Sequence, residues 1–153
     1  MPPHPDVSAL EDHLGYLLRM VSNAVSQRFA RKVEAEGVTV AEWAFMRVLY
    51  DTEGLAPTAL ASRMGMTKGA ITKLAGRLVD KHLLRREANP ADKRAQTLAL
   101  TTKGRLLVPR LAKLADENDA AFFDVLRPQD RSDLERLLKR IIASRDLQGV
   151  PTD

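Results

Sequence analysis

The sequence predicts a mainly α-helical chain with one small β-hairpin, arranged as a winged helix-turn-helix. Apolar residues recur at helical spacing in long segments near both ends of the chain. Two shorter helical patterns, separated by a glycine, occupy residues 57–82. Two strand-like segments follow directly and are joined by an Asn-Pro turn. A helix-turn-helix that runs into a hairpin is the order that defines a winged helix.

Composition narrows the class of protein. The chain has 153 residues, of which 44% are hydrophobic and 29% charged, so we expect one folded subunit over residues 1–153. The absence of cysteine excludes disulfides, thiolate nucleophiles, cysteine-bearing zinc sites and a thiol-oxidation switch. The sequence contains no apolar run of membrane-spanning length and no secretory signal, so we expect a cytoplasmic protein without membrane contact.

Positive charge is concentrated in the middle of the chain. The net charge is +4, but between Arg63 and Arg105 there are 11 Lys or Arg residues against three acidic ones. A basic centre between acidic ends is typical of a local nucleic-acid contact, although an ordinary solvated surface gives the same pattern.

The first helix is predicted to begin at Ser8, which forms a capping-box pattern with Glu11. Its apolar stripe comprises Leu10, Leu14, Leu17, Val21, Val25, Phe29 and Val33, and Gly37 ends it. A second helix should begin after Thr39 as its cap and turn Trp43, Met46 and Leu49 or Tyr50 inward.

The helix-turn-helix follows. Pro57 opens a short helix, Gly65 interrupts it, and Thr67 caps a longer helix over residues 68–82. On this second helix the apolar residues Ile71, Leu74 and Leu78 share one side. The opposite side carries Lys68, Gly69, Thr72, Lys73, Gly76 and Arg77.

That opposite side is suited to DNA. Lys and Arg reach phosphates or guanine edges, Thr contacts bases or phosphates, and glycine lets the backbone approach a groove. We therefore expect the major groove or its phosphates to be contacted by Thr67, Lys68, Gly69, Thr72, Lys73 and Arg77. The alternative is a solvated helix whose basic residues have no partner.

The hairpin is predicted to pair residues 83–88 with 96–101 around the turn 89–94, in which Asn89 and Pro90 set the chain reversal. At its tip Arg94 would enter a minor groove, and Lys93 would reach phosphate or lie in solvent. Asp92 would brace the tip by accepting hydrogen bonds.

Two more helices complete the chain. The first follows "TTKG", residues 101–104, with a stripe of Leu107, Leu111, Leu114, Phe122 and Val125. Pro109 predicts a kink or a delayed start in it. Pro128 separates this helix from the last one, which covers residues 129–145. Residues 147–153 should fray. The apolar face of the last helix is too wide for a solvated end and needs a partner: Leu134, Leu137, Leu138, Ile141 and Ile142.

Residues 65–104, "GMTKGAITKLAGRLVDKHLLRREANPADKRAQTLALTTKG", resemble the centre of the MarR family of winged-helix transcriptional regulators. The family pattern has an Asp-x-Arg wing, here Asp92-Lys93-Arg94, and a Leu-Thr-x-x-Gly exit, here Leu100 to Gly104. The resemblance extends over about residues 8–145. The chain departs from the family at His82, where glycine is common, and at Gly76, where an acidic residue is frequent.

The resemblance implies a homodimer that binds a pseudo-palindromic operator in double-stranded DNA, and we expect this regulator to be a repressor. Residues 38–101 would form the DNA-binding lobe, and residues 8–37 and 102–146 the dimerisation region. A two-fold axis would place the recognition helices one DNA turn apart, roughly 34–36 Å.

The resemblance also implies a small-molecule effector, often aromatic or phenolic, bound between the dimer helices and the lobe. The matching residues here are His13, Tyr16, Leu17, Met20, Trp43 and Arg47. For each of them, packing or surface exposure is the competing interpretation.

Two other classes of function fit the sequence less well. A winged helix that binds protein instead of DNA would need an apolar recognition face, which Lys68, Thr72 and Lys73 do not provide. An enzyme is disfavoured because no nucleophile arrangement or phosphate loop is present. His4, His13 and His82 lack metal-ligand spacing, so we expect neither metal nor cofactor.

Overall fold

A computed structural model describes residues 7–89 and 91–152, without the side chains of residues 92–94. Its elements are η1 (Leu10–Asp12), α1 (Leu14–Glu34), α2 (Val40–Tyr50), α3 (Pro57–Met64), α4 (Lys68–Asp80), β1 (Leu84–Asn89), β2 (Asp92–Leu100), α5 (Thr102–Phe122) and α6 (Pro128–Ser144). Helices dominate, and the two strands form an antiparallel hairpin. The predicted mainly α winged helix-turn-helix is confirmed.

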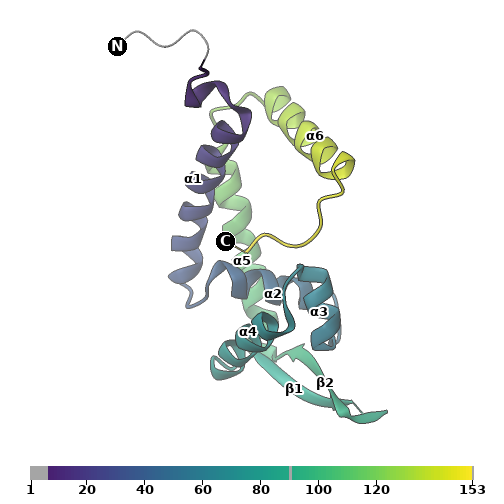
Figure 1. Cartoon of the computed structure of the whole chain (residues 1–153). Coiled ribbons are helices and arrows are strands. Elements are labelled where there is room, and N and C mark those ends of the chain that lie inside the picture. The colour runs from purple at the N-terminus through teal and green to yellow at the C-terminus, as the bar shows by residue number, and fades with distance from the viewer. Residues whose placement is uncertain (1–6, 90, 153) are drawn as a thin grey trace.

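The helices and strands are arranged at two ends of an elongated subunit (Figure 1). Long helices α1 and α5 lie side by side at one end, and α2, α3, α4 and the hairpin gather at the other. Buried side chains from all four helices α2–α5 and from both strands meet in one core, which includes Phe45, Leu60, Ile71, Leu100 and Val108. Within the described residues, no helix has the length and apolar character needed to cross a membrane.

The start of the first helix differs from the prediction. Ser8 does not cap it, because the backbone is extended at His13 (φ −97°, ψ 123°) and α1 begins only at Leu14. Before that break, Asp12 Oδ2 accepts a hydrogen bond from the Ala9 N–H at 3.1 Å and closes a separate 3₁₀ turn. The Asp12 side chain, four residues after Ser8, therefore competes with the predicted cap and forms the 3₁₀ turn instead.

The predicted caps of the lobe helices are confirmed. Thr39 Oγ1 accepts from the Glu42 N–H and Thr67 Oγ1 from the Ala70 N–H, each at 3.1 Å. Gly65 has a φ of 65°, the left-handed conformation that glycine adopts with least strain, and ends α3. α3 and α4 are thereby held as a helix-turn-helix.

The hairpin turn is tighter than predicted. β2 begins at Asp92, so residues 92–94 belong to a strand and not to the turn. The expected role of Pro90 concerns a residue outside the described part of the structure. Asn89 Oδ1 accepts from the Ala91 N–H at 2.9 Å, which supports the expected role of Asn89 in the reversal. The register jumps from Ala88↔Gln96 to Asn89↔Asp92, so residues 93–95 form an irregularity in β2.

The C-terminal helices bring three corrections. α5 begins at Thr102 and continues through Pro109, so its start is not delayed; Pro109 is exposed, where water can reach the carbonyl group left unbonded. Val125 lies beyond the end of α5 and is 84% exposed, so it does not belong to the stripe. Residues 147–152 do not fray. They return to the lobe, where the Val150 N–H donates to the Met64 carbonyl at 3.2 Å.

Candidate nucleic-acid interface

The outward side of α4 is polar and accessible. Ile71 and Leu78 are fully buried and orient the helix by packing into the lobe core. As predicted, this leaves one basic and polar face in solvent: Thr67, Lys68, Gly69, Thr72, Lys73 and Arg77. No apolar side chain stands among these six residues, and a Cβ added at Gly69 would meet nothing within 4 Å.

The wing lies next to α4. Arg85 and Arg86 of β1 are exposed, and the Arg86 Nη2 lies 4.0 Å from where a Cβ would stand at Gly76. The structure therefore adds Arg86 to the basic surface, a residue that sequence analysis missed because only strand pairing carries it to α4. The predicted contacts of Asp92, Lys93 and Arg94 concern side chains outside the described part of the structure.

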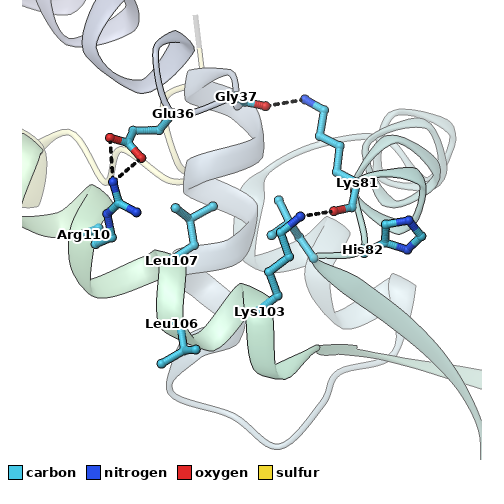
Figure 2. Close-up of a pocket in the computed structure, with 9 residues that line it drawn as sticks. Glu36, Gly37, Lys81, His82, Lys103, Leu106, Leu107 and Arg110 are labelled. Atoms are coloured by element: carbon cyan, nitrogen blue, oxygen red, sulfur yellow. Dashed lines mark hydrogen bonds and ion pairs between the residues drawn. The ribbon is translucent and has the colours of Figure 1, made fainter.

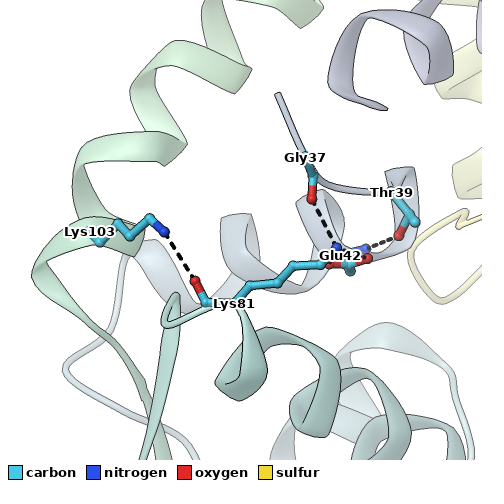
Figure 3. A network of polar contacts seen from close by, with 5 residues as sticks. All are labelled: Gly37, Thr39, Glu42, Lys81 and Lys103. Atoms are coloured by element: carbon cyan, nitrogen blue, oxygen red, sulfur yellow. Dashed lines mark hydrogen bonds and ion pairs between the residues drawn. The ribbon is translucent and has the colours of Figure 1, made fainter. Parts of the chain in front are cut away.

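A polar network holds the far end of α4 (Figure 3). Lys81, the residue that follows the helix, donates from Nζ to both carboxylate oxygens of Glu42 at 2.7 and 3.0 Å. The same ammonium donates to the Gly37 carbonyl at 2.9 Å. Lys103 Nζ in turn donates to the Lys81 carbonyl at 3.2 Å. Glu42 is only 1% exposed, so an ion pair to a buried carboxylate attaches the end of the recognition helix to α2. The hydrogen bond to Gly37 attaches it to the α1–α2 turn.

Local contacts of Thr101, Gly104 and His82 fix the path of the chain from the wing into α5. Thr101 Oγ1 donates to the His82 carbonyl at 2.7 Å and accepts from the Gly104 N–H at 3.0 Å, which caps α5. A Cβ at Gly104 would collide with the Leu83 carbonyl oxygen, so no larger residue fits. His82 has a φ of 62°, a left-handed conformation that glycine adopts with less strain than histidine.

Comparison with known proteins agrees with this geometry. Residues 36–95 match the model of the MarR family. A proposed transcriptional regulatory protein for the hcr operon of Thauera aromatica is 31% identical over 134 residues, covering 87% of this chain and 81% of that protein. The chain belongs to the MarR family. An HTH-type transcriptional repressor of Mycobacterium tuberculosis is 26% identical and covers 84% of this chain and 92% of its own length.

Solved MarR-family structures have the same fold. A mutant of MarR from Escherichia coli in complex with operator DNA superimposes with a TM-score of 0.75 at 25% identity. The match covers 84% of this chain and 93% of that one. The winged helix-turn-helix described above is therefore the MarR-family fold.

The residues expected around an effector are not gathered in this MarR-family subunit. Trp43 packs against α1 at Phe29, with ring centroids 6.3 Å apart in an edge-on arrangement. Met20 lies nine residues before Phe29, about two and a half helical turns closer to the N-terminus of α1. Leu17, Tyr16 and His13 are closer still to that end of the helix. Arg47 pairs with Asp51 at 2.7 Å.

Proposed function

We propose that this MarR-family regulator is a homodimeric repressor that reads a pseudo-palindromic operator in double-stranded DNA through α4 and the wing. The observation that carries the proposal is the outward face of α4, which is basic, free of bulky apolar groups and held in place by a buried apolar side. An interface for protein would need apolar anchors, and this face offers none.

Each part of the surface has a defined role in the proposal. Thr67 and Thr72 contact bases or phosphates, and Gly69 brings the helix backbone close to the groove. Lys68, Lys73 and Arg77 supply charge toward phosphates or guanine. Arg94 enters the minor groove from the wing, Asp92 braces it, and Lys93 adds charge near the backbone. A mutant of the related Escherichia coli MarR has been solved in complex with operator DNA, which supports operator DNA as the partner.

Dimerisation is supported by uncovered apolar surface on the terminal helices. On α1, Leu14, Leu18 and Met20 are 78%, 46% and 56% exposed. On α6, none of the residues is buried, and Ile141 and Ile142 are each 49% exposed. Both of these apolar faces would be covered by a second copy of the chain. Residues 8–37 and 102–146 thus form the dimerisation region, and residues 38–101 the DNA-binding lobe.

The proposal includes release from DNA by a small effector, aromatic or phenolic in class. Because α1 carries His13, Tyr16, Leu17 and Met20 away from Trp43 and Arg47, a pocket built from all six residues needs α1 of a partner subunit to approach α2. Such a pocket would couple effector binding to the dimer geometry.

Footprinting on the DNA that flanks its own gene tests the function. We expect protection of two half-sites about one helical turn apart. Titration of the protected fragment should give a plot of log K against log salt with a slope of about −4 or steeper, because several cations displace counterions. A flat salt response with no protected region would contradict DNA reading. An apolar partner protein would then be the better candidate.

A further inference from the structure

The C-terminal end of the chain returns from α6 to the helix-turn-helix (Figure 1). α6 ends at Ser144, and residues 147–152, here called the C-terminal strap, reach the lobe on the side away from the hairpin. The Val150 N–H donates to the Met64 carbonyl at 3.2 Å, and the Val150 side chain packs against the lobe core. The strap thus joins a helix of the proposed dimerisation region to the α3–α4 turn.

The strap bonds to a group that α3 itself leaves without a partner. Met64 is the last residue of α3, and the final four carbonyl groups of a helix have no partner within that helix. The N–H groups of the α3–α4 turn donate to two of these carbonyls, those of Ala61 and Ser62. The Val150 N–H satisfies the Met64 carbonyl, so a distant part of the chain acts as a cap on α3.

Two glycines allow the strap to approach the turn closely. Gly65 has a φ of 65° and Gly149 a φ of 92°, both in the left-handed region. A Cβ added at Gly65 would stand 3.1 Å from the Gly149 Cα, which is closer than side chains normally come to a backbone. A β-branched residue in place of Gly149 would be strained at this φ and should displace the strap from the turn.

The strap also adjoins the recognition helix. Pro151 and Thr152 line a hollow of about 560 Å³ together with Arg77, which belongs to the outward face of α4. The residue after α4 is held separately, because Lys81 donates a hydrogen bond to the Gly37 carbonyl (Figure 2). The strap instead holds the turn from which α4 begins. The position of α4 therefore depends on two supports, and only the strap leads to α6.

We propose that the C-terminal strap couples the position of α6 to the helix-turn-helix, and that docking of the strap and binding of operator DNA favour each other. With the strap docked, the end of α3 is already capped, so less ordering is needed when the helix-turn-helix binds DNA. A displacement of α6 would pull the strap from Met64 and remove this cap. The coupling to DNA rests on the proposed function, in which α4 reads an operator.

Operator titration of the full-length Gly149→Val variant tests the coupling, using the DNA fragment identified by footprinting. Gln148→Val is the matched control, since Gln148 is exposed and its backbone is not left-handed. We expect operator affinity to fall at least about 5-fold in Gly149→Val and to stay within about 2-fold of the wild type in Gln148→Val. Deletion of residues 147–153 should reproduce the loss. Light scattering should give the same oligomeric state for all of these proteins.

Amide hydrogen exchange tests the docking without DNA. The Val150 amide should exchange at least about 10-fold more slowly in the wild type than in Gly149→Val, and operator DNA should slow it further. Three results would overturn the proposal: an unprotected Val150 amide in the wild type, unchanged or higher operator affinity in either strap variant, or an equal loss in Gln148→Val. A wild-type protein with a protected Val150 amide and no operator binding would instead contradict the proposed function, so the two failures are distinguishable.

Discussion

Lys81 and Glu42 are 39 residues apart in sequence and joined by a two-pronged ion pair in which the ammonium lies 2.7 and 3.0 Å from the two carboxylate oxygens. The carboxylate is buried on α2, whereas the lysine stem is 39% exposed and emerges from the end of α4. The pair therefore sets the position of the recognition helix relative to the rest of the lobe.

Lys81→Met should destabilise the protein because it leaves the buried Glu42 carboxylate without its cation. The expected loss is about 1–3 kcal/mol in the free energy of unfolding, below the cost of a fully buried pair because Lys81 is partly solvated. Denaturant unfolding measures it. Pairing Lys81→Met with Glu42→Met should recover most of the loss. If the single and double variants are equally unstable, the pair does not act as a unit.

Val150→Ser should weaken the docking of the C-terminal segment on the helix-turn-helix. Val150 is partly buried against the lobe core, so the lost apolar contact should cost about 1 kcal/mol of unfolding free energy. Val125→Ser is the matched control, since Val125 is 84% exposed and its loss should cost almost nothing. Identical melting temperatures for both variants would mean that the segment adds no stability.

Ile141→Asp should produce a monomer, because it places a charge in the centre of the uncovered face of α6. Light scattering should report a mass near the 17.0 kDa of one chain, against twice that value for the wild type. Lys139→Ala, on the polar side of the same helix, should remain dimeric. A wild-type protein that is monomeric at micromolar concentration would refute the dimer.

Arg94→Ala should weaken operator binding about 10-fold while leaving the dimer intact, because the proposed minor-groove contact is lost. Fluorescence anisotropy at fixed salt measures this change, with Lys113→Ala as the control for removal of a cation remote from the wing. Equal affinities for Arg94→Ala and the wild type would remove the wing from the interface.

The local parts of the fold were predictable from sequence because their causes are local. Thr39 and Thr67 cap the helices they precede, and Ile71, Leu74 and Leu78 bury the side of α4 that their spacing indicated. Ser8 shows where this reasoning fails, since the capping-box spacing was present but Asp12 formed a competing bond.

Features that depend on distant parts of the chain were not predictable. Nothing near Glu42 indicates that its partner comes from the end of α4. The docking of Val150 on Met64 similarly joins segments 86 residues apart. The position of Arg86 next to Gly76 also depends on how the hairpin pairs and packs, which the sequence near either residue does not indicate.

The most direct test of the account is the operator affinity of Gly69→Leu. Gly69 faces open space, so a leucine fits the free protein and should raise its stability by about 0.5–1 kcal/mol, as expected for replacing a helical glycine. The same side chain would stand between α4 and the groove. Anisotropy titration should therefore show at least about a 10-fold loss of operator affinity in a protein that melts no lower than the wild type. Wild-type affinity in this variant would contradict the assignment of the outward face of α4 to DNA.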